Sequence, residues 1–263
     1  KLGAVPYQPA NKAEFGLYLS NNWYRLTAGD GILSRDPVEG LDEAKWAANF
    51  NGIDQYLRNN NDTAIYPWGY GGAITHVVEF IIDEINEVDQ VTLISVSYAK
   101  TDKSLIRGFS IALNANGKIQ YRVGGANDEF SLSLTRYGST VLVPGKLYRV
   151  EVIIAMDGSF IAKVNGVEDK QVTGGAANYS SSYIFIGSNT SKFFNGKVLR
   201  YEMFNEDKSV YHLWDFQPTN GDRANMLKNK NEDGSVKGTS NLTPVNVPGI
   251  DNVDPENGFF VTI

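Results

Sequence analysis

The stretch that decides the fold reads GFSIALNANGKIQYRV and spans residues 108–123. Apolar and polar residues alternate through residues 108–113 and again through residues 118–123, with Asn116-Gly117 between them. Alternation with a period of two predicts a strand with one buried face, and an Asn-Gly pair between two such strands is a strong hairpin signal. We therefore predict an antiparallel hairpin in this stretch.

The same pattern recurs along most of the chain. Segments of this kind, bounded by Gly, Asn, Asp or Pro, occupy residues 49–57, 74–82, 91–98, 130–134, 140–143, 146–155, 159–164, 183–187, 194–203, 209–216 and 258–263. Helical periodicity is almost absent, and only residues 41–48 favour a helical turn. Many short strands separated by turn signals predict an all-β chain folded as a two-sheet antiparallel β-sandwich.

The order of the motifs resembles that of the concanavalin A-like, laminin-G-like jelly-roll superfamily. The motifs are Phe50, Gly52 and Tyr56 in FNGIDQY, the apolar strands 77–82 and 91–98, the Gly-Phe-Ser hairpin 108–123, Pro-Gly-Lys-X-Tyr-X-Val at 144–150, Val-Asn-Gly at 164–166, Ile-Gly at 186–187, Phe-X-Gly-X-Val at 194–198 and Trp-Asp-Phe at 214–216. The resemblance implies a jelly roll, a fold that usually serves as a sugar- or surface-binding module and only sometimes as an enzyme.

Three regions are expected. We expect residues 1–45 to form an N-terminal arm or small attachment subdomain. We expect residues 46–240 to form the laminin-G-like sandwich, and residues 241–263 to form an irregular C-terminal tail with a final short strand.

The segment FGLYLSNNWYRL at residues 15–26 is similar to segments of tailed-phage fibre and baseplate proteins, and residues 216–227 are similar to laminin-G-like domains of phage structural proteins. This second resemblance implies a virion protein that contacts other virion subunits or copies of itself.

Composition narrows the classes of function. The chain has 263 residues, of which 42% are hydrophobic, and a formal net charge of −6, so a broad affinity for nucleic acid is not expected. It has no cysteine, which excludes disulfides, Cys-based zinc sites and a Cys nucleophile. No apolar run approaches the roughly 18 residues that a membrane span requires. We expect a location on a virion surface or outside the cell, without membrane insertion.

Catalytic motifs of this fold are not found. In the acidic run at residues 83–89, the residue two positions after Glu84 is Asn86 rather than a second acid. The run also lies between two predicted strands, so we interpret it as a solvated turn. A glycosidase needs two carboxyl groups on one face of a strand or cleft. The two histidines, His76 and His212, lie in strands and are expected to be structural. We expect no enzymatic activity.

The best candidate for ligand binding is an aromatic loop. Aromatic rings stack on the apolar faces of sugar rings, while Asn and Asp side chains bind hydroxyl groups. The candidate residues are Tyr66, Trp68, Tyr70, Asn61 and Asp62. The alternative is that the aromatic residues plug an edge of the sandwich. A second candidate combines residues 124–129 with Arg136 and Tyr137. The expected partner is a cell-surface glycan.

One stretch has the alternating oxygen ligands of a calcium loop. Asn229, Asn231 and Asp233 precede Gly234, but Ser240 stands where an EF-hand has its bidentate glutamate, so an EF-hand is excluded. An ordinary turn is the favoured interpretation. No cofactor is expected, and a structural calcium ion is left open.

For function, a virion protein that binds glycans is expected first, a secreted bacterial carbohydrate-binding module second, and a polysaccharide hydrolase or lyase third.

Overall fold

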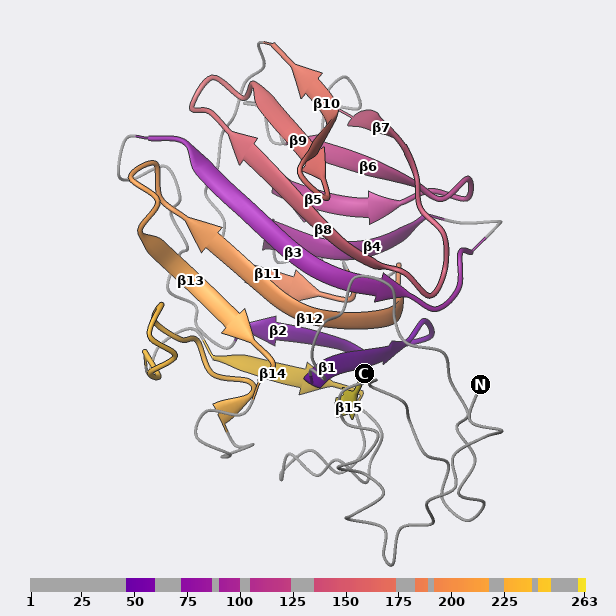
Figure 1. The fold of residues 1–263 in the computed structure, drawn as a ribbon, viewed down its shortest axis with the longest axis vertical. Coiled ribbons are helices and arrows are strands. Elements are labelled where there is room, and N and C mark those ends of the chain that lie inside the picture. Colours follow the sequence, from indigo (N-terminus) through magenta and orange to yellow (C-terminus); the bar gives the residue numbers. More distant parts are fainter. Residues whose placement is uncertain are drawn as a thin grey trace, which may run out of the picture.

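A computed structural model describes residues 46–59, 72–86, 90–99, 105–123, 135–173, 183–188, 192–217, 225–237, 241–246 and 260–263. Within these residues the named elements are all β-strands, and their pairings are all antiparallel (Figure 1). No helix in this part of the chain is long and apolar enough to cross a membrane.

The strands form two sheets. The first is eight-stranded, with the order β10-β9-β8-β3-β12-β1-β15 and with β13 also paired to β12. Its strands are β1 (Trp46–Asn51), β3 (Ile74–Ile82), β8 (Leu147–Ile154), β9 (Phe160–Val164), β10 (Val167–Val172), β12 (Asn195–Phe204), β13 (Val210–Asp215) and β15 (Phe260–Thr262).

The second sheet is seven-stranded, with the order β14-β2-β11-β4-β5-β6-β7. Its strands are β2 (Tyr56–Asn59), β4 (Val91–Ala99), β5 (Leu105–Leu113), β6 (Lys118–Val123), β7 (Thr135–Val141), β11 (Tyr183–Ile186) and β14 (Leu242–Val245). The chain passes repeatedly from one sheet to the other, as in a jelly roll. The structure confirms the predicted fold class, an all-β sandwich of two antiparallel sheets.

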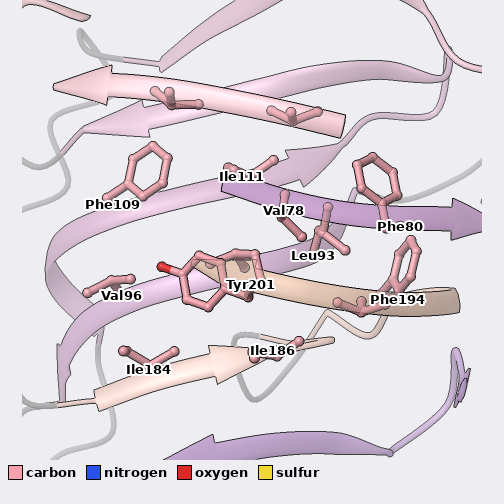
Figure 2. Close-up of a cluster of buried hydrophobic side chains, with 14 of the residues drawn as sticks. Val78, Phe80, Leu93, Val96, Phe109, Ile111, Ile184, Ile186, Phe194 and Tyr201 are labelled. Carbon is pink, nitrogen blue, oxygen red and sulfur yellow. The ribbon is translucent and has the colours of Figure 1, made fainter. Parts of the chain in front are cut away.

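The core lies between the two sheets, and alternate residues of each strand supply it. Val78 and Phe80 of β3 point toward Phe109 and Ile111 of β5, and all four side chains are buried (Figure 2). Fully burying one such side chain contributes about 1.5–3 kcal/mol to folding. The alternation visible in the sequence therefore becomes two apolar inner faces.

The hairpin at residues 108–123 forms as predicted. Its turn is held by Asn114, whose side-chain oxygen accepts hydrogen bonds from the backbone N–H groups of Asn116 and Lys118 at 3.0 and 2.9 Å. Gly117 takes a positive φ of 69°, which glycine adopts without steric cost. Turn chemistry and alternation thus agree at this position.

The expected single strand at residues 49–57 is wrong, because the structure divides it between the two sheets. β1 ends at Asn51 and β2 begins at Tyr56. The side-chain oxygen of Asn51 accepts N–H bonds from Ile53, Asp54 and Gln55, at 2.9, 3.2 and 3.3 Å. This local turn carries the chain from one sheet to the other.

The expected helical turn at residues 41–48 is also wrong over its described part. Trp46, Ala47 and Ala48 belong to β1, which pairs with β12 on one side and β15 on the other. Ladder hydrogen bonds and the burial of both alanines outweigh the weak helical preference. Residues 1–45 lie outside the described residues, so the arm stays a prediction.

The C-terminal tail adds strands to both sheets. β15 lies within the strand predicted at residues 258–263, whereas β14 was not expected. β14 pairs with β2 at the edge of its sheet, a position where Pro244 is tolerated because one side of the strand needs no ladder bond. The predicted strand at residues 130–134 lies outside the described residues. The boundaries of the three predicted regions stay a prediction.

Candidate functional site

The first predicted glycan site falls where the structure gives no description. Asn61, Asp62, Tyr66, Trp68 and Tyr70 all lie outside the described residues, and the site stays a prediction. Residues 124–129 of the second candidate lie outside them as well. Arg136 and Tyr137 of the second candidate, by contrast, belong to the described strand β7.

Tyr137 lies on the outer face of the seven-stranded sheet. Along β6 the inward residues Ile119, Tyr121 and Val123 join the core, so Gln120 and Arg122 point outward. The register places Ala112, Gln120 and Tyr137 in one row across β5, β6 and β7. A neighbouring row contains Ser95, Ser110, Arg122 and Thr135. The surface formed by Gln120, Arg122 and Tyr137 is called the β6–β7 site below.

The β6–β7 site combines an exposed ring with a buried amide. Tyr137 is 51% exposed, and its hydroxyl oxygen accepts a hydrogen bond of 3.1 Å from Nε2 of Gln120. Gln120 itself is only 3% exposed. Among the described residues, its Oε1 atom is buried and has no hydrogen-bond partner. Buried polar atoms are almost always paired, so this oxygen is a candidate acceptor for a ligand that displaces the groups covering it.

Arg122 supplies the complementary donor. Its Nη2 donates to Oε1 of Gln90 at 2.8 Å, while its Nε is buried and has no hydrogen-bond partner in the described part of the chain. Burial lowers the pKa of Arg122 below its ordinary value, and the nearby Tyr137 acts in the opposite direction. The site therefore offers an acceptor at residue 120, a donor at residue 122 and an exposed aromatic ring at residue 137.

The two histidines are structural, as predicted. His76 is buried, its Nδ1 lies 2.8 Å from the hydroxyl of Tyr201, and burial lowers its pKa to about 3. His212 is buried beside Asn229, 2.9 Å away, and burial is the main reason that its pKa is lowered to about 4.

The acidic run begins after β3 ends, as expected for a turn. Asp83 forms an ion pair with Lys197, and Glu84 accepts a hydrogen bond of 3.1 Å from Asn195. Both acids line an open groove of about 870 Å³ at this end of the sandwich, together with Ile53 and apolar residues of neighbouring loops. No group of three or more His, Cys, Asp or Glu side chains in the described residues is arranged to hold a metal ion.

The stretch considered for calcium is a turn, and its side-chain oxygen atoms are not arranged to bind a metal ion. Oδ1 of Asn229 accepts the backbone N–H of Leu213 at 3.0 Å, and Asn229 is fully buried. Oδ1 of Asp233 accepts the N–H of Ser235 at 2.9 Å, which tightens the turn. These oxygens are directed to the protein's own donors rather than to a common point.

A second hollow of about 620 Å³ lies at the opposite end of β3 and β12. Its walls include Gly72, Ile74, Asn205, Asp207 and Tyr211. Asp207 already accepts the N–H and hydroxyl of Ser209, at 2.9 and 2.5 Å. Because Asn205 and Asp207 are engaged in the turn between β12 and β13, this hollow is a weaker candidate than the β6–β7 site.

Comparison with known proteins gives similarities of structure only. No protein-family model and no curated protein match the chain. A heptameric SAP-like pentraxin from Limulus polyphemus has a TM-score of 0.49 and 11% identity over 83% of this chain and 94% of its own. A candidate carbohydrate-binding protein from Bacteroides ovatus has a TM-score of 0.46 and 13% identity, over 81% of this chain and 65% of its own. The CBM40 of Ruminococcus gnavus IT-sialidase has a TM-score of 0.46 and 13% identity, over 61% of this chain and 90% of its own.

Proposed function

We propose that this chain is a non-enzymatic β-sandwich that binds carbohydrate, and that the β6–β7 site contacts the sugar. The observation that carries the proposal is the exposed ring of Tyr137 beside the buried oxygen of Gln120, which has no hydrogen-bond partner among the described residues. An unpaired buried acceptor costs about 1–3 kcal/mol, which a ligand hydroxyl group would recover. A ring with a free face and neighbouring polar atoms is the usual composition of a sugar site.

The aromatic loop belongs to the same proposal. Tyr66, Trp68 and Tyr70 would supply further stacking surfaces, and Asn61 and Asp62 would bind hydroxyl groups. The support for this part is the sequence alone, where three aromatic residues follow a polar run.

For the biological setting, we propose the surface of a tailed-phage virion. The support is the sequence similarity at residues 15–26 and 216–227 and the presence of a region before the sandwich. Residues 1–45 would contact other virion subunits or further copies of this chain, and the sandwich would face a cell-surface glycan. A secreted bacterial carbohydrate-binding module has equal support from the described sandwich. A polysaccharide hydrolase or lyase has less, because Asp83 and Glu84 are engaged by Lys197 and Asn195 of β12.

The proposal is tested by glycan-array screening of the whole chain, followed by calorimetric titration of the strongest ligand. Tyr137→Ala should weaken binding about tenfold, since an aromatic stacking contact is worth about 0.5–1.5 kcal/mol beyond its buried area. Met156→Ala is the matched control, because Met156 is similarly exposed at 54% but lies in the turn between β8 and β9. Trp68→Ala tests the loop in the same titration. An array without any bound glycan would contradict the proposal.

A further inference from the structure

Arg122 differs from the cations of the sandwich that form ion pairs, and from Lys230 and Lys237, whose ammonium groups donate to backbone carbonyl oxygens. Arg149, Arg200, Lys163 and Lys197 each form an ion pair with an Asp or Glu side chain within 4 Å. Arg122 instead donates to the neutral amide of Gln90. Among the described residues, Arg122 forms no salt bridge, and its buried Nε donates to no acceptor.

The neighbours of Arg122 in its row are also uncharged. Ser110 lies opposite Arg122 on β5, Ser95 follows on β4, and Thr135 lies opposite on β7. A half-buried cation is costly unless an opposite charge compensates it. The guanidinium group is also the side chain best suited to bind a planar carboxylate or a sulfate, through its fixed N–H donors.

We propose that the sugar bound at the β6–β7 site carries an anionic group, a carboxylate or a sulfate, that accepts a hydrogen bond from Nε of Arg122. A hydroxyl group of the same ligand donates to Oε1 of Gln120. Both protein atoms are buried, so binding requires the groups that cover them to move aside. This inference rests on the proposed function and names the class of glycan that the site selects.

The spacing of the two residues suits one ligand. Gln120 and Arg122 are alternate residues of β6 on the same face, so their Cα atoms are about 7 Å apart. Tyr137 lies directly opposite Gln120, which places the exposed ring at the hydroxyl end of the ligand and the guanidinium at its anionic end. A neutral sugar would satisfy Gln120 but would leave the charge of Arg122 without a counter-charge.

The test uses matched pairs of glycans that differ in one group. One arm compares a uronic-acid oligosaccharide with the same compound after reduction of its carboxyl groups. The other arm compares a sulfated oligosaccharide with its desulfated form. We expect at least a tenfold preference for the anionic member in one arm, and the arm that shows it identifies the anion. The preference should decrease as salt is raised, because the interaction is partly electrostatic.

Two variants assign the preference to Arg122. Arg122→Gln should reduce the preference to less than twofold while the neutral member still binds, and Arg122→Lys should recover only part of it, since lysine lacks Nε in the same position. Arg58→Gln is the control, because Arg58 is exposed on β2 in the same row of the sheet and its loss removes the same charge. Thermal unfolding of each variant verifies that it is folded.

The outcomes separate the two proposals. Equal binding of anionic and neutral members by the unmodified chain would overturn this inference and leave the proposed function standing. Retention of the full preference by folded Arg122→Gln, or its loss in Arg58→Gln alone, would overturn it as well. If no member of either pair and no glycan on the array binds, both proposals are wrong.

Discussion

The hydroxyl group of Tyr121, on β6, donates a hydrogen bond of 2.7 Å to Oδ2 of Asp169, on the edge strand β10 of the other sheet. The pairing of β10 with β9 shifts register between Glu168 and Lys170, so Asp169 lies at a bulge. A bulge can turn a side chain that would otherwise face outward. Asp169 is consequently buried, and its Oδ1 accepts the backbone N–H of Thr140 on β7 at 2.7 Å. One carboxyl group thus joins the edges of both sheets.

Removal of this carboxyl group should destabilise the sandwich. Asp169→Ala leaves the buried hydroxyl of Tyr121 and the partly buried N–H of Thr140 without their partner, and we expect a loss of about 2–4 kcal/mol in the free energy of unfolding. Urea denaturation measures it. The control is Glu168→Ala, at the exposed neighbouring position, which should change stability by less than about 0.5 kcal/mol. Equal effects of the two substitutions would show that the carboxyl group does not join the sheets.

Stability should also fall in alkaline solution because of Tyr121. Burial, and then the hydrogen bond and charge of Asp169, raise the pKa of this phenol well above its ordinary value of 10. Above pH 10 the unfolded chain releases this proton while the folded chain retains it, so the contribution is complete below pH 10 and decreases above it. The expected decrease is about 1.4 kcal/mol per pH unit from this group. Measuring the free energy of unfolding of the original chain and of Tyr121→Phe at pH 9 to 11 isolates the contribution of this phenol. Parallel pH profiles of the two proteins would show that Tyr121 is not the source of the decrease.

Acid should destabilise the chain through the two buried histidines. The pKa of His76 is lowered from 6.5 to about 3, so the folded state stays neutral while the unfolded state binds a proton below pH 6.5. The contribution of the neutral imidazole to the free energy of unfolding is complete above pH 6.5. It is lost as the pH falls toward 3, by about 1.4 kcal/mol per pH unit for each histidine. His212, with a pKa of about 4, acts over a narrower window. His76→Gln should therefore have a shallower dependence of unfolding free energy between pH 6.5 and 4, and an unchanged slope would contradict the neutral, buried imidazole.

Gly52 should be more sensitive to substitution than Gly166. Both have positive φ angles, 72° and 81°, so Gly52→Ala and Gly166→Ala share the same backbone strain. A Cβ atom at residue 52 would lie 2.8 Å from Cβ of Asn195, whereas at residue 166 no heavy atom of the described residues, apart from its chain neighbours, lies within 4 Å. We expect Gly52→Ala to cost about 1–3 kcal/mol more than Gly166→Ala, because it adds overpacking. Thermal unfolding measures the difference, and equal costs would mean that the turn yields freely.

Strand positions followed from local pattern where the pattern was long. The predicted segments 74–82 and 118–123 coincide with β3 and β6, because alternation of buried and outward residues is what a paired strand needs. Alternation does not tell which sheet a strand joins, and for that reason the passage from β1 to β2 was missed. β14 was missed because it has four residues, includes Pro244, and is defined by pairing with the distant β2.

The β6–β7 site was accessible from sequence only in part. Tyr137 was a candidate because aromatic residues are frequent in sugar sites, but Gln120 and Arg122 carried no motif. Their positions two residues apart in an alternating strand indicate that they share an outward face. The register between β6 and β7 decides that Tyr137 reaches Gln120. The same register leaves Oε1 of Gln120 and Nε of Arg122 without partners in the described part of the chain. No local pattern encodes that register.

The place of β1 between β12 and β15 affects how this protein can be handled. Deleting residues 258–263 would remove β15 and convert β1 from an interior strand into an edge with open backbone donors and acceptors. Such an edge pairs readily with the same edge of a second molecule. Shortened versions of the chain are therefore expected to self-associate through β1, so purification tags and truncations are better placed elsewhere than at this strand.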